Sequence, residues 1–385
     1  MTLANWQEPP YNRWAFQHVR ELIPTARISR GSGAVWRLPR AERDLSRVRV
    51  RAAGRRIRLA SLLEQTYTDG FLVLHRGRIV TEHYANGLTP DTTHLLMSVS
   101  KSVVSSVVGV LVGRGLLRPS DLVTDHLPDL RGTSFEECTV RHLLDMRAGT
   151  RFEEDYANLE ADVRVYEEVY LWRPRSGRRL PDDIVSYYRI LENAGPHGGP
   201  FGYRSILTDV LGWVAERVSN ARLADLIARE LWQPMGAEFD AEITVDAHGN
   251  AMADGGMCCT LRDLARFGQL MLQRGRRARR DIVPSAWVRD TLTPDADTVR
   301  AFAGEARRRG LPTGSYYRNQ WWVIDPSRPS FMASGINGQM VLVDVPTSVV
   351  IAKLSTWPEA LPPDLPGLTR SACLDLARQL AEELD

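Results

Sequence analysis

The chain has 385 residues, of which 43% are hydrophobic and 25% charged, and its formal net charge is +2. These values are typical of a soluble globular protein with room for two domains, and they give no electrostatic reason to expect a nucleic-acid partner. No stretch approaches the roughly 18 apolar residues of a membrane span, and residues 1–30 lack the apolar run of an export signal. We therefore expect a cytoplasmic protein without a membrane partner.

Cysteine and histidine form no metal-binding pattern. The four cysteines contain no C-x-x-C pair, and the eight histidines are scattered without ligand spacing. We expect reduced structural thiols, no metal and no cofactor. Two arginine runs, at 276–280 and 307–309, lie beside glycine without interleaved aromatic residues, which favours solvated loops.

The first third of the chain predicts one hairpin and one buried helix. Residues 1–60 are rich in Arg and Pro and mostly irregular, apart from a helix near 13–22. Apolar runs at 70–75 and 78–84 flank a short turn and predict a β-hairpin. A helix over about 98–113 follows, and because it is apolar on nearly all sides we expect it to be buried.

The middle of the chain is mainly helical, and strands return near the C-terminus. We expect helices from a Thr139 cap, over 205–218, over 223–231 and from a Thr260 cap to about Leu272, then strands at 320–324, 339–345 and 348–354 and a helix at 369–384. This order predicts an α/β (α+β) fold with one antiparallel sheet flanked by helices and an inserted, mainly helical domain. The sheet domain would comprise 1–115 and 300–385 and the helical domain 116–299, with the active site at their interface.

Lysine is almost absent, and one of the two copies lies three residues after a serine. Lys101 and Lys353 are the only lysines, and Ser98 and Lys101 form the only S-x-x-K of the chain. Residues i and i+3 share one helix face, and a lysine can serve as a base when burial lowers its pKa towards neutrality. S-x-x-K is the arrangement of serine acyl-transfer enzymes. A chance match on a serine-rich helix is the alternative.

The S-x-x-K segment and its surroundings resemble the serine β-lactamase/penicillin-binding-like hydrolases over about residues 70–360, which implies a β-lactamase-like fold. The second motif of that family, Y-x-N, resembles Tyr203-Arg204-Ser205, where Ser205 stands in place of the usual Asn. The resemblance therefore implies that Tyr203 is catalytic together with Ser98 and Lys101. A buried structural tyrosine is the alternative.

The third motif of the family, K-T-G on a strand facing the serine, resembles the segment 333–339, which reads Ala-Ser-Gly-Ile-Asn-Gly-Gln. The resemblance implies an oxyanion hole made by the backbone N–H groups of Ser98 and Ile336, with Gly335 and Asn337 against the substrate. Ala333 replaces the lysine that commonly helps to bind a penicillin-type carboxylate, which argues against β-lactam turnover. An ordinary glycine-rich hairpin is the alternative.

Within this superfamily the chain is most similar to the 6-aminohexanoate-dimer hydrolases and related carboxylesterases, through segments 5–14, 255–268 and 335–339. That branch uses a tyrosine on a mobile loop to contact the substrate amide, and Tyr156 matches its place; a solvated acidic loop is the alternative. An acyl pocket is expected to be walled by Tyr316, Tyr317, Trp321 and Trp322, although aromatic residues at strand spacing also suit a core.

The sequence thus favours a serine hydrolase for a small-molecule ester or linear amide. Ser98 would attack the carbonyl carbon, and water would release an acyl-Ser98 intermediate. Whether Lys101 or Tyr203 is the primary base stays open, as does a homodimer. The alternatives are a catalytically silent ligand-binding protein of the same fold and a D,D-peptidase or β-lactamase.

Overall fold

The computed structural model describes residues 1–382, and its largest feature is a seven-stranded antiparallel sheet. The strand order is β11-β12-β13-β14-β15-β4-β5. The bounds are β4 Thr68–His75, β5 Arg78–Tyr84, β11 Tyr316–Arg318, β12 Trp321–Asp325, β13 Ser330–Gly335, β14 Gln339–Asp344 and β15 Val349–Ser355. The pairing of β15 with β4 joins the two ends of the chain, for example Ile351 opposite Val73. The predicted sheet and β-hairpin are therefore confirmed.

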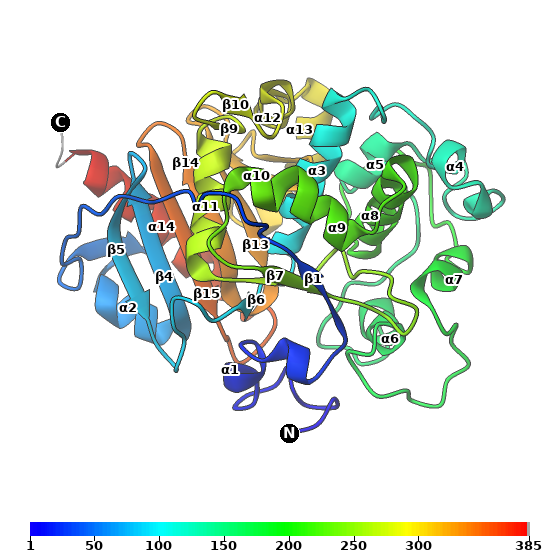
Figure 1. Cartoon of the computed structure of the whole chain (residues 1–385), viewed down its shortest axis with the longest axis horizontal. Helices are drawn as coiled ribbons and strands as arrows, with labels where there is room; N and C mark the ends of the chain where they lie inside the picture. The colour runs from blue at the N-terminus through cyan, green and yellow to red at the C-terminus, as the bar shows by residue number, and fades with distance from the viewer. Residues whose placement is uncertain (383–385) are drawn as a thin grey trace.

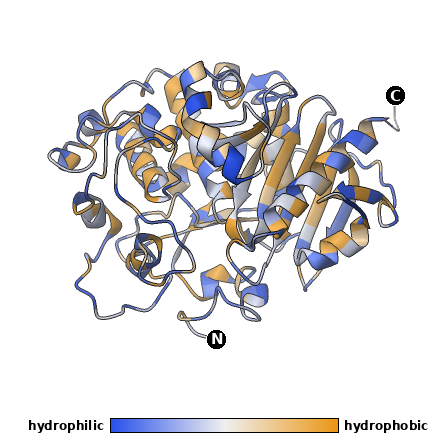
Figure 2. Cartoon of the chain, turned by 180° about the vertical axis from the view of Figure 1, so that it is seen from behind, coloured by the Kyte–Doolittle hydropathy of each residue, from blue (hydrophilic) through white to orange (hydrophobic). Residues whose placement is uncertain are grey.

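Helices cover both faces of this sheet (Figure 1). α11 (Leu261–Leu272) lies on one face against β4, β14 and β15, and α14 (Leu365–Glu382) lies on the other. A Cβ atom on Gly268 would meet Val350 Cγ1 at 2.5 Å, so glycine is needed for the close approach of α11. The strands between the two helices are hydrophobic along most of their length (Figure 2). They form the core of the sheet region.

Two of the expected helices differ from the structure in position or extent. α11 belongs to the stretch expected in the helical domain, yet its contacts place it on the sheet. Thr260 caps it as expected, since its Oγ accepts the N–H of Asp263 at 3.2 Å. The helix expected near 13–22 is only a short α1 (Asn12–Ala15) followed by a 3₁₀ turn (Val19–Glu21). The last residues expected in the C-terminal helix, 383 and 384, lie outside the described residues.

Three smaller sheets complete the β-structure. A four-stranded sheet has the order β1-β7-β8-β6, and two pairs are formed by β2 with β3 and by β9 with β10. Their bounds are β1 Thr25–Ile28, β2 Arg49–Ala52, β3 Arg55–Arg58, β6 His94–Leu95, β7 Ala241–Thr244, β8 Met257–Cys259, β9 Arg276–Arg277 and β10 Arg280–Asp281. The arginine run at 276–280, expected as a loop, thus forms a short hairpin.

The helical region packs around α3 (Val99–Gly113), which lies between strands β13 and β14 on one side and α8 on the other (Figure 1). Every residue of α3 from Val99 to Leu111 is buried, as expected. The remaining helices are α2 Leu59–Gln65, α4 Val123–His126, α5 Val140–Leu144, α6 Asp162–Val169, α7 Ile184–Arg189, α8 Ile206–Ser219, α9 Leu223–Ile227, α10 Gln233–Met235, α12 Ser285–Leu292 and α13 Ala296–Arg308. Short 3₁₀ or π turns lie at Pro128–Leu130, Ala228–Trp232 and Ile336–Gly338. Across the described residues, we find no helix of the length and apolarity that crossing a bilayer would take.

Candidate active site

Ser98 lies immediately before the first turn of α3, where the backbone directs its side chain into a cavity. The residue before it, Met97, has φ +48°, a left-handed conformation that is unfavourable for a residue with a side chain. Ser98 is 8% exposed. Strained backbone next to a nearly buried hydroxyl at a helix N-terminus is typical of a functional position.

Lys101 is 1% exposed, and its ammonium group is fully surrounded by oxygen atoms. Its Nζ donates to Ser98 Oγ at 2.8 Å and to Ser205 Oγ at 3.0 Å. It also donates to the backbone oxygen of Asp254 at 3.0 Å and to Asp254 Oδ2 at 3.2 Å. The predicted proximity of Ser98 and Lys101 is therefore present, and Asp254 supplies a counter-charge that no sequence motif indicated.

The electrostatic surroundings of Lys101 differ from the sequence-based expectation. Burial alone would lower the pKa of Lys101, but the charge of Asp254, supported by Tyr203, Glu154 and Asp209, raises it above its usual value. Lys101 is therefore an ammonium at neutral pH. The condition that burial lowers this pKa towards neutrality is therefore not met, because acidic groups that no sequence motif indicated lie around the lysine.

Tyr203 lies beside this pair, with Lys101 Nζ 5.2 Å from the centre of its ring. Burial raises the pKa of Tyr203 above its usual value, although Lys101 and hydrogen bonding with Ser98 act in the opposite direction. The phenol is thus protonated at neutral pH and faces the hydroxyl of Ser98. The structure brings together the three residues that the sequence selected as catalytic.

Ser205, which stands where the related motif has Asn, connects Lys101 to a second acid. Its Oγ donates a short hydrogen bond to Glu154 Oε1, and its backbone N–H donates to Glu154 Oε2 at 2.8 Å. Burial raises the pKa of Glu154, against the hydrogen bonds from Ser205 and the charge of Lys101. Glu154 also accepts from the hydroxyl of Tyr156. The serine therefore occupies a defined place in a hydrogen-bonded chain from Lys101 to Tyr156.

Strand β13 ends against the backbone of Ser98. A Cβ atom on Gly335 would lie 2.7 Å from Leu96 O and 2.9 Å from Ser98 N, so only glycine permits this contact. In the turns and loops of the described residues, the N–H groups of Ser98 and Ile336 donate to no backbone carbonyl. Ser98 and Ile336 both line the cavity, so these two N–H groups border it.

The cavity over Ser98 has a volume of about 260 Å³. Tyr156, Tyr203, Gly335 and Ile336 line it together with Ser98, and its other lining residues are Glu154, Phe201, Gly202, Glu305, Arg308, Arg309, Trp322, Ser334 and Leu361. Asn337 lies outside this lining and borders an adjacent cavity of about 370 Å³, which shares Tyr156. Its side chain donates to the backbone oxygen of Trp357 at 3.0 Å, so it holds a loop in place.

Of the four aromatic residues expected to wall the pocket, only Trp322 lines the cavity. Trp321 is fully buried between Phe267 and Phe331, at ring-centre distances of 5.7 and 5.1 Å, and does not line the cavity. Trp322 lines it and stacks on Tyr203 at 5.6 Å. Successive residues of a strand point to opposite faces, so a shift of one residue reverses the assignment.

The loop that carries Tyr156 is anchored in this structure. Arg164 donates from Nε and one Nη to the backbone oxygen of Tyr156, at 2.9 and 2.7 Å, and its guanidinium lies 5.6 Å from the centre of the Tyr156 ring. Tyr156 is half-buried and lines both cavities. Its position suits contact with a substrate that reaches from Ser98 towards the second cavity.

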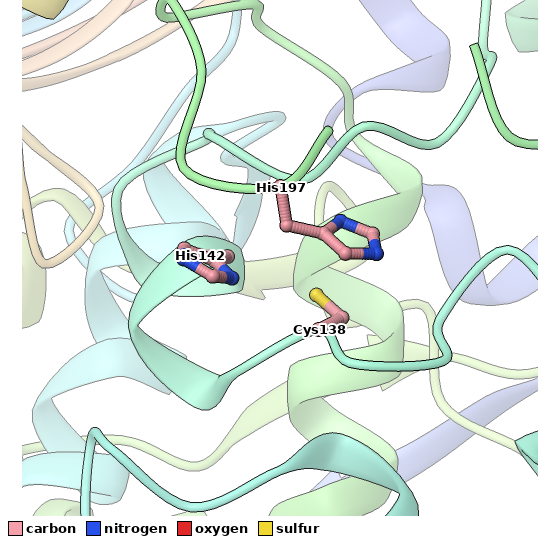
Figure 3. A group of neighbouring side chains, drawn as sticks. All are labelled: Cys138, His142 and His197. Carbon is pink, nitrogen blue, oxygen red and sulfur yellow. The ribbon is translucent and has the colours of Figure 1, made fainter. Parts of the chain in front are cut away.

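One cluster within residues 1–382 brings together three groups that are able to bind a metal, namely Cys138, His142 and His197 (Figure 3), with ligand atoms within 4.8 Å of one another. Both ring nitrogens of His197 are already in use, because Nδ1 accepts the N–H of Gly149 and Nε2 donates to Glu136 O. Burial raises the pKa of the Cys138 thiol to about 12. These contacts suit loop anchoring better than metal coordination.

Comparison with known proteins agrees with this geometry. A beta-lactamase family profile matches residues 58–373. A 6-aminohexanoate-dimer hydrolase from Paenarthrobacter ureafaciens is 38% identical over 379 residues, which cover 98% of this chain and 94% of that protein. The structure of a proposed 6-aminohexanoate-dimer hydrolase from Bacillus anthracis superposes with a TM-score of 0.88 at 25% identity, covering 99% of this chain and 97% of the other. A family VIII carboxylesterase shares the fold, with a TM-score of 0.60 at 16% identity over 82% of this chain and 95% of the other.

The resemblance expected from the S-x-x-K segment is thus confirmed, and so is the β-lactamase-like fold. The matched region includes Ser98, Lys101, Tyr203 and the β13 segment that faces them. The chain belongs to the beta-lactamase family of hydrolases.

Proposed function

We propose that the protein is a serine hydrolase that cleaves a carboxylic ester or a linear amide through an acyl-Ser98 intermediate. The observation that carries this proposal is the 2.8 Å hydrogen bond between the buried ammonium of Lys101 and Ser98 Oγ, at the floor of a cavity that Tyr203 also lines. A nucleophilic hydroxyl needs a proton acceptor within such a distance, and the amine of Lys101 becomes one once its ammonium has lost a proton.

In the proposed acylation, Ser98 Oγ attacks the carbonyl carbon and the carbonyl oxygen becomes negatively charged. The free N–H groups of Ser98 and Ile336 border the cavity, so they are available to bind that oxygen. The N-terminal end of α3 adds the positive end of its dipole. The close fit of Gly335 against Leu96 and Ser98 supports this arrangement, because it brings the residue before Ile336 against the backbone N–H of Ser98.

Proton transfer is proposed to involve Lys101 and Tyr203 as one coupled unit. Both the ammonium and the phenol have a raised pKa, so both groups are protonated at neutral pH. The pair must lose one proton before it can accept the proton of Ser98. After loss of that proton, the pair accepts the proton of Ser98 and passes it to the leaving oxygen or nitrogen. Water then attacks the acyl-Ser98 carbonyl and the acid product leaves.

The substrate class rests on two supports. The curated relative is named for hydrolysis of a 6-aminohexanoate dimer, and the fold neighbours include a carboxylesterase. Ala333 at the third motif leaves no lysine for a penicillin-type carboxylate, which disfavours β-lactam turnover. We therefore propose an ester or linear amide and place β-lactams and cell-wall peptides among the outcomes of the test.

Hydrolysis of p-nitrophenyl butyrate, a linear p-nitroanilide and nitrocefin by wild type and Ser98→Ala tests this proposal. We expect turnover of the ester or the anilide by wild type, loss of at least 1,000-fold in the variant, and no turnover of nitrocefin. Equal rates in wild type and variant would contradict the nucleophile assignment. If folded wild type turns over none of the substrates, a ligand-binding protein is favoured. If it turns over nitrocefin in preference to the ester and the anilide, a β-lactamase is favoured.

A further inference from the structure

The mouth of the active-site cavity carries a group of arginines around one carboxylate. Arg308 and Arg309 lie at the end of α13 and line the cavity together with Glu305. Arg370, on α14, donates to the backbone oxygen of Arg309 at 3.2 Å and so lies beside them. We call Arg308, Arg309 and Arg370, with Glu305 between the first two, the arginine rim.

The arginine rim has more positive charge than its own carboxylate can neutralise. Glu305 accepts from Nε and one Nη of Arg308 at 2.8 and 2.6 Å, and it also accepts from Nε of Arg309. Two guanidinium groups thus share one carboxylate, and a third, that of Arg370, binds the backbone beside them. The other carboxylate of the cavity lining, Glu154, is already engaged by Ser205 and Tyr156.

Burial and mutual repulsion make this excess of charge costly within the free protein. Burial lowers the pKa of Arg370, and the charge of Arg309 lowers it further. Hydrogen bonds from Arg308 and Arg309 outweigh burial and lower the pKa of Glu305, so Glu305 stays ionised and neutralises only one of the three cations. A further anion at the arginine rim would therefore be bound favourably.

The guanidinium of Arg309 is held against the wall of the cavity. It lies 4.4 Å from the centre of the Trp322 ring, a cation–π distance, and its side chain is 27% exposed. Trp322 in turn stacks on Tyr203. Tyr203, Trp322 and Arg309 therefore form one continuous wall of the cavity, which ends in a positive charge. The side chain of Arg309 remains partly exposed.

We propose that the arginine rim binds a carboxylate at the end of the substrate remote from the scissile bond, so that the enzyme prefers anionic esters or amides to neutral ones. This inference rests on the proposed function. A planar guanidinium pairs with a carboxylate through two parallel hydrogen bonds, and Arg308 and Arg309 present two such groups. The run 307–309 was expected to be a solvated loop, but only Arg307 is both exposed and absent from the cavity lining.

Two matched pairs of esters test the inference. Mono-p-nitrophenyl adipate against p-nitrophenyl hexanoate places the extra carboxylate on the acyl group, and 4-butyryloxybenzoate against its methyl ester places it on the leaving group. We expect at least a 10-fold higher kcat/KM for the anionic member of one pair, chiefly through KM. Arg309→Gln should reduce that preference about 10-fold, and circular dichroism reports whether the variant is folded. Arg308→Gln should reduce it less, and Arg307→Gln should leave it unchanged.

Equal kcat/KM within both pairs, or a preference that survives Arg309→Gln, would overturn the inference while leaving the hydrolase proposal intact. If wild type hydrolyses none of the esters, binding still decides the question. Titration of the Ser98→Ala protein with hexanamide and with adipamate, which differs by one remote carboxylate, should then give tighter binding of adipamate. That difference should be lost in Ser98→Ala with Arg309→Gln, and equal affinities would refute the role of the arginine rim.

Discussion

Replacing Asp254 with Asn tests how the charge state of Lys101 is set. Asp254 Oδ2 lies 3.2 Å from Lys101 Nζ, and the backbone oxygen of Asp254 accepts a second hydrogen bond from the same group. Asn keeps the shape of the side chain and the backbone contact and removes only the negative charge. The substitution therefore separates the charge of Asp254 from its role in positioning the lysine.

The expected change is large. Two opposite unit charges 3.2 Å apart attract by roughly 5 kcal/mol at an effective dielectric constant of about 20, part of which offsets burial of the pair. An opposite charge at such a distance changes a pKa by roughly one to three units. Without Asp254, burial becomes the dominant influence, and the pKa of Lys101 should fall.

The sign of the effect on activity follows from the base that Ser98 needs. The deprotonated form of the pair Lys101 and Tyr203 grows as pH rises, so kcat/KM should rise with pH in wild type. A lower pKa of Lys101 moves this rise to lower pH. We expect the midpoint to move down by at least one pH unit in Asp254→Asn, even if the plateau is reduced by a weaker base.

The assay is kcat/KM for p-nitrophenyl butyrate across the pH range in which circular dichroism shows folded protein. Asp182→Asn is the matched control, because the side chain of Asp182 is 93% exposed and its ion pair within residues 1–382 is with Arg175. It should leave the midpoint unchanged. An unchanged or higher midpoint in Asp254→Asn would refute the account of how the charge of Lys101 is set.

Four further substitutions, one of them with a control, test the geometry of the site. Gly335→Ala should lower kcat/KM by roughly 10- to 100-fold by displacing β13. Gly367→Ala is the control and should not, because a Cβ atom there would meet no atom within 4 Å apart from the backbone of its own helix. Trp321→Ala should lower the free energy of unfolding, measured by urea titration, by about 3–5 kcal/mol and leave KM unchanged. Trp322→Ala should raise KM in steady-state kinetics. A raised KM in Trp321→Ala with an unchanged KM in Trp322→Ala would contradict their placement. Ser205→Ala should lower kcat about 10-fold, and an unchanged kcat would show that its bond to Lys101 is dispensable.

Local patterns were sufficient to predict much of the fold. Alternating and fully apolar runs predicted the β4–β5 hairpin, the buried helix α3 and the C-terminal strands β12, β14 and β15, but not β11 or β13. The two-residue strand β6 has no pattern of its own, because two residues carry no periodicity. β6 nevertheless leads into α3 and so helps to position Ser98.

The catalytic candidates could be predicted because a motif and a rare residue marked them, whereas their partners could not. Asp254 and Glu154 reach Lys101 and Ser205 only through the folded chain, from 153 and 51 residues away. Neither acid stands out in a sequence rich in acids, so the raised pKa of Lys101 could not be anticipated. The sequence likewise did not decide which of Trp321 and Trp322 lines the cavity, because neighbouring residues of a strand point to opposite faces.

The central claim is that Ser98 is a nucleophile activated by Lys101, and covalent labelling tests it most directly. Wild-type protein treated with a fluorophosphonate should gain one adduct by intact mass, and peptide mapping should place it on Ser98. Lys101→Met should slow labelling at least 100-fold in folded protein. A folded wild-type protein that gains no adduct, or that carries it on Ser205 or another serine, would contradict the account.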